Sequence, residues 1–136
     1  MIHALSPAPN IEPGIAPLCA ALNRAPDVTT IWSCEGHPSE GHRPYVVFAA
    51  PQAFAFAIDR ALSHPMPAAA ELQFVWKLMA NFRDDGTLQW IIDPNDERFS
   101  VPGLFGRARW TRKLADADIA VLARLVDELR GEFNER

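Results

Sequence analysis

Three segments of the chain place hydrophobic residues three and four positions apart, which is the spacing of one buried helical face. The first runs from Pro13 to Arg24, the second begins at Pro51 and ends near residue 64, and the third runs from Asp116 to about Phe133. Pro13 and Pro51 suit the first turn of a helix, and Asp116 suits an N-cap. The pattern therefore predicts three helices. Their inward residues are Ile15, Leu18, Cys19, Leu22, Phe54, Ile58, Ala61, Leu62, Ile119, Leu122, Val126, Leu129 and Phe133.

Four further segments are typical of β-strands. Val28–Ser33 and Tyr45–Ala49 are rich in β-branched and aromatic residues. From Leu72 to Arg83 the even positions are hydrophobic, and the strand after it alternates in the same way. These strands are expected to bury large side chains in the core, among them Trp32, Trp76, Leu88, Trp90 and Ile92.

The turn between the last two strands fixes their register. A two-residue turn at Asp85-Gly86 would place hydrophobic residues opposite polar ones. A three-residue loop from Asp84 to Gly86, with Gly86 in the left-handed conformation, instead pairs Phe82 with Leu88 and keeps hydrophobic residues on one face. The three-residue loop is therefore preferred.

The predicted element order is α-β-β-α-β-β-α, in one domain that spans residues 1–136. Four strands in a mostly antiparallel sheet with three helices on one face form an α+β two-layer sandwich. Residues 1–12 are expected to be an extended N-terminal arm because they contain several prolines. Residues 93–113 form a long connection with a short strand near residues 107–111.

Composition places the chain among globular proteins. It has 136 residues, of which 49% are hydrophobic and 22% are charged, and its net charge of -4 argues against a general DNA-coating protein. No apolar stretch approaches a membrane span, and the start of the chain lacks a basic region followed by an apolar one. We therefore expect a cytoplasmic protein without membrane association. Its two cysteines, Cys19 and Cys34, are expected to be free thiols.

The positive charge is concentrated in one segment. Arg98–Lys113 holds five cations and no acid. Arg107, Arg109 and Arg112 interleave with Trp110, a combination suited to phosphate contacts and base stacking. In the alternative interpretation these arginines pair with acidic residues, including Asp93, Asp96 and Glu97, and Trp110 packs in the core.

The loop that joins the first two strands, residues 34–44, concentrates chemically reactive side chains. Cys34, His37 and His42 could bind a zinc ion and leave a fourth position for water, a glutamate or a substrate. Cys34 could instead act as a nucleophile that a histidine activates. In the plainest interpretation the loop is polar because it is solvated. The sequence leaves these alternatives open and identifies no catalytic residue.

The same loop could also bind an anion. Gly36 allows close backbone approach, and His37, His42 and Arg43 could surround a phosphate or a carboxylate. This interpretation requires no covalent chemistry. The predicted ligand-binding residues are therefore Gly36, His37, His42, Arg43, Arg107, Arg109 and Trp110.

Residues 15–48 resemble the start of the tRNA wybutosine-synthesising methyltransferase family, whose signature reads roughly Thr-Thr-Ser-Ser-Cys-Ser-Gly-Arg. Thr30, Ser33, Cys34 and Gly36 match it, whereas His37 replaces the arginine. The resemblance implies S-adenosylmethionine as a cofactor and RNA as a substrate. The chain has no glycine-rich Rossmann fingerprint.

The function that the sequence favours is binding of an anionic small molecule or a nucleic acid through residues 34–43. One alternative is an RNA-modifying, S-adenosylmethionine-dependent enzyme. Another is an interaction module without catalysis, in which exposed aromatic surface around Phe99, Leu104 and Phe105 meets a partner. Neither the ligand nor the oligomeric state follows from the sequence.

Overall fold

The computed structural model describes residues 10–64, 67–100 and 109–134. Its elements follow the order α-β-β-α-β-β-α, with three short 3-10 turns between them. The helices and strands are α1 (Ala16–Arg24), β1 (Thr29–Cys34), β2 (Tyr45–Ala49), α2 (Gln52–Ser63), β3 (Trp76–Phe82), β4 (Leu88–Pro94) and α3 (Arg112–Asn134).

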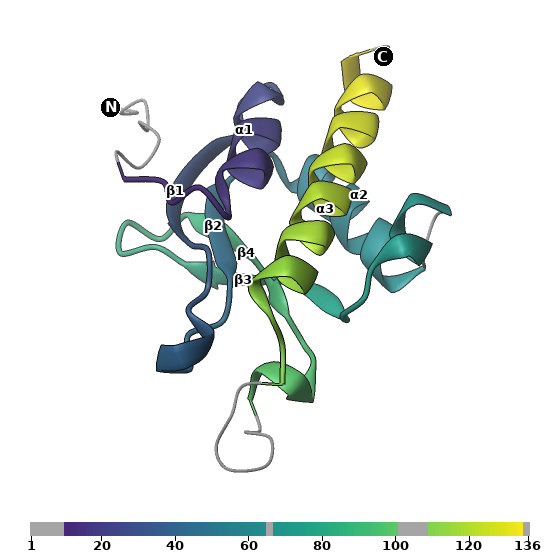
Figure 1. The fold of residues 1–136 in the computed structure, drawn as a ribbon. Coiled ribbons are helices and arrows are strands. Elements are labelled where there is room, and N and C mark those ends of the chain that lie inside the picture. Colours follow the sequence, from purple (N-terminus) through teal and green to yellow (C-terminus); the bar gives the residue numbers. More distant parts are fainter. Residues whose placement is uncertain (1–9, 65–66, 101–108, 135–136) are drawn as a thin grey trace.

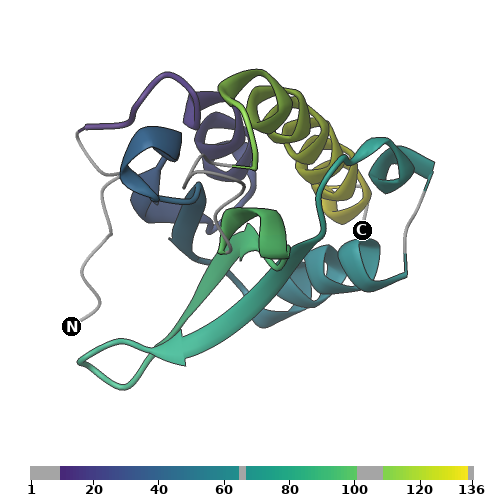
Figure 2. The same cartoon turned by 60° about the horizontal axis from the view of Figure 1, so that its bottom comes forward.

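The strands form one antiparallel sheet in the order β1-β2-β4-β3, and the helices lie on one side of it (Figure 1). The predicted α+β architecture, with three helices and a four-stranded antiparallel sheet, is thus confirmed. The β3–β4 hairpin extends past the helices as an arm (Figure 2). No helix in the described ranges combines the length and the hydropathy needed to cross a membrane.

The hairpin has the predicted register. Phe82 pairs with Leu88 and Ala80 pairs with Trp90. Gly86 has a φ of 86°, and its N–H donates to the carbonyl of Arg83. A glycine is favoured at this position because the left-handed conformation costs other residues free energy.

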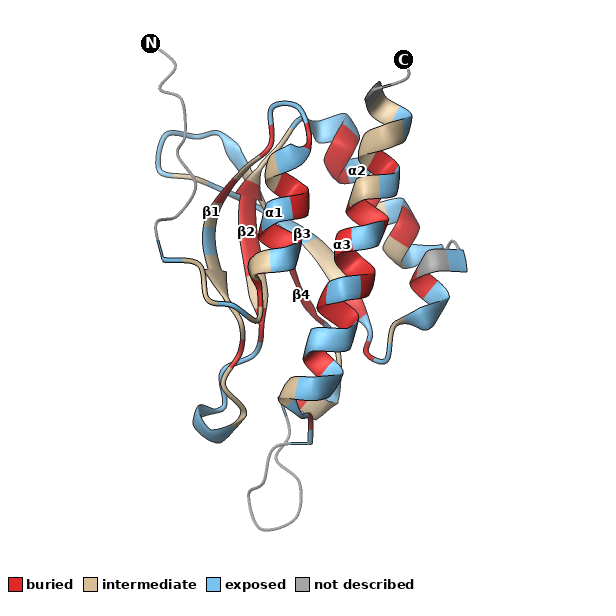
Figure 3. Cartoon of the chain, turned by 45° about the horizontal axis from the view of Figure 1, so that its top comes forward, coloured by how far each residue is buried: buried red, intermediate tan, exposed pale blue. Residues whose placement is uncertain are grey.

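The core lies between the sheet and the helices, where buried residues follow β2 and one side of α1 and α3 (Figure 3). Val46, Phe48 and Ile92 supply the sheet side of this core, and each has at most 1% of its surface exposed. Cys19 is also fully buried, as the helical pattern predicts.

The predictions that Trp32 and Leu88 lie in the core are wrong, because Trp32 is 64% exposed and Leu88, beside the hairpin turn, is 39% exposed. A bulge in β1 shifts the register between Thr30 and Trp32. Thr30 pairs with the core residue Phe48, whereas Trp32 pairs with Val47 on the next position of β2. Successive residues of a strand point to opposite faces, so the bulge turns Trp32 to the face without helices.

Two element boundaries also differ from those predicted. The third strand begins at Trp76 instead of Leu72, because the N–H groups of Gln73 and Phe74 donate to the buried carboxylate of Asp118 on α3. The last helix begins at Arg112, and the Thr111 hydroxyl accepts a hydrogen bond from its first turn. Distant side chains and a threonine cap therefore set boundaries that hydrophobic periodicity does not encode.

Candidate functional site

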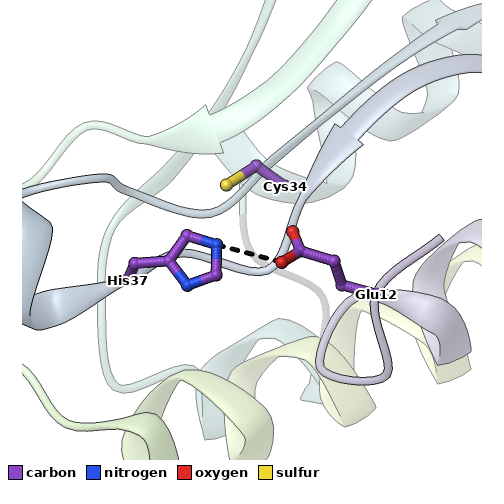
Figure 4. Close-up of side chains that lie close together, drawn as sticks. All are labelled: Glu12, Cys34 and His37. Atoms are coloured by element: carbon purple, nitrogen blue, oxygen red, sulfur yellow. Dashed lines mark ion pairs between the residues drawn. The ribbon is translucent and has the colours of Figure 1, made fainter. Parts of the chain in front are cut away.

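Three side chains from separate segments converge beside the end of β1. They are Glu12 from the segment before α1, Cys34 from the last position of β1, and His37 from the following loop (Figure 4). Each offers one ligand atom, and these atoms lie within 4.8 Å of one another. All three residues are partly buried.

Glu12 is held by its backbone and by its carboxylate. Its carbonyl accepts hydrogen bonds from the N–H groups of Ile15 and Ala16, which fixes Glu12 at the entry to α1. One carboxylate oxygen accepts a hydrogen bond of 3.1 Å from the N–H of Glu35, and the other lies 3.0 Å from Nε2 of His37. The Glu12 side chain therefore connects the N-terminal segment to the loop after β1.

A small closed loop presents His37. The N–H of His37 donates to the carbonyl of His42 over 2.8 Å, and the N–H of His42 donates back over 3.1 Å. The 3-10 turn Pro38–Glu40 lies between them, and Gly41 closes it with a φ of 73°. Because both backbone bonds hold the base of this loop, the direction of the His37 side chain is set by local structure.

Cys34 presents its sulfur to the same space. Its Sγ accepts a hydrogen bond of 3.3 Å from the N–H of Gly36. Partial burial raises the pKa of the Cys34 thiol, and the negative charges of Glu12 and Glu35 raise it further, although the Gly36 N–H opposes them. Without a cation nearby, the sulfur therefore favours its protonated form.

Gly36 joins the site to the core. It is buried with a φ of 88°, and a Cβ at this position would lie 2.7 Å from the ring of Trp110. The Arg112 guanidinium donates from Nη1 to the carbonyls of Glu35 and Gly36 over 2.6 and 2.9 Å. The backbone between Cys34 and His37 is therefore pressed against an aromatic ring and bound by an arginine of α3.

The other residues predicted for the loop lie outside this cluster. Nδ1 of His42 lies 3.4 Å from the exposed carboxylate of Glu40, and the ring centroids of His37 and His42 are 5.9 Å apart. Arg43 forms an ion pair of 3.2 Å with the buried Asp93. Among the residues predicted as metal ligands, Cys34 and His37 come together, and their third partner is Glu12.

The basic segment is largely neutralised where the structure describes it. Arg98 binds Asp96, and Arg109 lies 3.7 Å from Glu97. Trp110 is 4% exposed and packs against Phe99. These contacts correspond to the alternative interpretation, in which the arginines pair with acids and Trp110 packs in the core.

The aromatic surface expected around Phe99 is not exposed at that residue, which retains 9% of its accessible surface and belongs to the core cluster. Phe99 packs against Phe74 at a centroid distance of 4.6 Å, which accounts for its burial. Leu104, Phe105 and Arg107 lie outside the described residues. The short strand expected near residues 107–111 is not formed in its described part, residues 109–111, which bend into α3.

Sequence reasoning missed Glu12 and Arg112 as parts of the site. Glu12 stands in the predicted arm, 22 positions before Cys34, without a spacing motif that links the two. Arg112 was assigned to the basic segment, and its contact with the loop depends on the docking of α3. Neither residue carries a local signal for this role.

Comparison with known proteins gives no further assignment, since no family model, no curated protein and no solved structure matches the chain.

Proposed function

We propose that the protein binds a divalent transition metal ion, with Zn²⁺ the best fit, through Glu12, Cys34 and His37. The observation that carries this proposal is the convergence of one carboxylate oxygen, one imidazole nitrogen and one sulfur within 4.8 Å. Zinc sites use these three ligand types, and a site with three protein ligands keeps a fourth position open for water or a substrate.

The geometry requires only small movements to accept the ion. In a tetrahedral zinc site the usual bond lengths place neighbouring ligand atoms about 3.3 to 3.6 Å apart. His37 Nε2 and the Glu12 oxygen are 3.0 Å apart, and no pair among the three ligand atoms exceeds 4.8 Å. Changes of about 1.5 Å or less in these separations would therefore bring the three ligand atoms to zinc-binding positions.

Electrostatics favour a cation here over a metal-free thiol nucleophile. Burial and two neighbouring carboxylates raise the pKa of the Cys34 thiol, which opposes formation of the thiolate that nucleophilic attack needs. A bound Zn²⁺ reverses this balance because it stabilises the thiolate and neutralises the carboxylate of Glu12.

We infer that an anion would bind to the metal ion and not to the arginines of the loop and the basic segment. Arg43 and Arg109 already face carboxylates, so neither offers an unpaired charge to a ligand. The open position of a three-ligand metal site accepts water, carboxylate or phosphate oxygens. A small anion bound to the ion is therefore the ligand class that we propose. Binding of S-adenosylmethionine or RNA stays a prediction.

The proposal is tested on protein purified without a histidine tag and stripped of metal. Zinc affinity is measured by competition with a chromophoric chelator, and Co²⁺ reports thiolate coordination through its absorption bands. Cys34→Ser, His37→Ala and Glu12→Gln should each weaken zinc binding by more than about 100-fold, since even residues that only support a ligand contribute about 10- to 100-fold. Phosphate or acetate should then perturb the cobalt spectrum if the fourth position is open.

His42→Ala is the matched control, since this histidine belongs to the same loop and was predicted as a ligand from sequence. We expect it to retain zinc affinity within about threefold, because its side chain is 60% exposed and directed to Glu40. A stoichiometric zinc site that tolerates Glu12→Gln but not His42→Ala would replace the proposed ligand set. Absence of tight zinc binding in the wild type would overturn the proposal.

A further inference from the structure

The two edges of the sheet differ in their protection. β1 and β3 are the edge strands. β1 contains a bulge between Thr30 and Trp32, which disfavours pairing with another strand. β3 pairs with β4 in an unbroken register over seven residues, and its sole charged side chain is Lys77. Lys77 lies 3.9 Å from Asp93 on β4, so its charge is already countered within the sheet. β3 therefore presents a regular edge without the usual protection.

A hollow of about 310 Å³ lies between this edge and α2. Gln52, Ala55, Phe56 and Asp59 line it from α2, Leu78–Ala80 line it from β3, and Trp90 contributes from β4. Phe56 is 63% exposed and Met79 is 49% exposed. Further along the hairpin, at the end of β3, Phe82 is 74% exposed. The exposed apolar surface thus follows the strand edge.

We propose that a second copy of this chain covers the edge, with β3 pairing antiparallel to β3 of its partner across a twofold axis. A twofold operation makes neighbouring β3 strands antiparallel and yields one continuous eight-stranded sheet from two four-stranded ones. This single contact pairs the backbone N–H and C=O groups at the β3 edge of both copies, so that neither edge can accept another strand.

The exposed apolar area near β3 approaches the apolar area that one partner of a homodimer buries. Phe56 and Phe82, at 63% and 74% exposure, offer roughly 270 Å² together. Met79 and Leu88 raise this to the order of 400 Å². A stable homodimer buries about 800 Å² per partner, of which about 65% is apolar. These four side chains therefore supply most of the roughly 500 Å² of apolar area that such an interface needs. A single added peptide strand would leave the arm around Phe82 uncovered, whereas a second copy brings its own α2 and hairpin.

The test is the molar mass in solution by sedimentation equilibrium over a wide concentration range. Wild type should reach twice the chain mass of 15.1 kDa. Met79→Lys and Phe56→Glu should each raise the dissociation constant at least tenfold, because they place charge in an apolar contact. Leu114→Ser is the control, since it removes an exposed apolar side chain from α3, which lies outside the sheet, and it should leave the dimer intact.

A mixture of Met79→Lys and Met79→Glu chains provides a second measurement. The two variants should form a heterodimer while each alone is weakened, which excludes misfolding as the cause of the loss. A wild type that stays monomeric at every concentration overturns the proposal and leaves the edge to a different partner. A dimer that resists both substitutions but is lost in Leu114→Ser also overturns it, since association would then use α3. Zinc binding at Glu12, Cys34 and His37 is measured separately and does not depend on this result.

Discussion

Replacing Gly36 by alanine tests how closely the site depends on the hydrophobic core. Gly36 has a φ of 88°, which costs a residue with a Cβ about 1 to 2 kcal/mol. The added Cβ would also lie 2.7 Å from the Trp110 ring and 2.9 Å from the backbone nitrogen of Pro44. Overpacking of a buried site typically adds about 1 to 3 kcal/mol. We therefore expect Gly36→Ala to lower the free energy of unfolding by about 2 to 5 kcal/mol.

Gly41→Ala separates the two contributions. Gly41 has a similar φ of 73° in the same loop, but a Cβ there would meet no atom within 4 Å. It should therefore show only the conformational cost of about 1 to 2 kcal/mol. Urea unfolding followed by tryptophan fluorescence measures both variants. With a slope of about 2 kcal/mol per molar urea, the midpoint of Gly36→Ala should lie roughly 1 M below that of Gly41→Ala.

The same two glycine variants should also differ in zinc affinity. The Gly36 N–H donates to Cys34 Sγ, so a displaced backbone also moves a proposed zinc ligand. Gly36→Ala should consequently lose zinc affinity at protein concentrations and temperatures where the variant is still folded, whereas Gly41→Ala should lose less. Equal midpoints for the two variants would refute the close contact between the loop and Trp110.

Three further outcomes are expected. Asp118→Ala should lower the free energy of unfolding in urea by about 3 to 5 kcal/mol. It removes the acceptor of three hydrogen bonds, which come from the N–H groups of Gln73 and Phe74 and from the indole of Trp76. Glu128→Ala, at an exposed position of α3, should change this free energy by less than about 0.5 kcal/mol. Hydrogen bonds from Arg98 hold the pKa of the Asp96 carboxyl well below its usual value of 3.8, so its contribution to stability is present above that pH and is lost as the pH falls below it. Thermal unfolding of Asp96→Asn should therefore show a weaker decline below pH 3.8 than the exposed Asp84→Asn does. The raised pKa of the Cys34 thiol predicts that zinc affinity increases by about tenfold per pH unit while the thiol remains protonated, and competition titrations of Cys34→Ser should lack this thiol-dependent increase.

The parts of the fold that follow from sequence are those set by neighbouring residues. Alternation along β3 and β4, together with a glycine two positions before Leu88, was sufficient to choose the observed register. Where distant groups intervene, the same reasoning fails. Gln73 and Phe74 continue the alternation of the strand, yet their N–H groups are taken by Asp118 on α3. Similarly, the bulge in β1 reverses the face of Trp32, although the composition of this segment predicts a strand correctly.

The candidate site divides in the same way. Cys34 and His37 are close in sequence, and the density of polar groups in their loop was enough to suggest them as ligands. The third metal ligand is where sequence and structure differ. Proximity in sequence favours His42, whereas the structure places Glu12 beside Cys34 and His37. Residues 37 and 42 do meet, but through their backbones, so the loop closes while the His42 side chain is directed toward Glu40. A hairpin-like closure can thus bring two histidines together without making both of them ligands.

The position of Glu12 follows from long-range packing. α1 is held to α3 by an apolar interface and by the ion pair of Arg24 with Asp127, and this docking brings the start of α1 beside the loop. Arg112, on the first turn of α3, binds the loop backbone between Cys34 and His37. The same helix therefore positions both halves of the site, one through α1 and the other through its own first turn. Packing of the core already places Glu12 beside Cys34 and His37. A zinc ion bound to all three residues would link the start of α1 to the loop, so zinc binding should stabilise the docking of α1 as well as the loop.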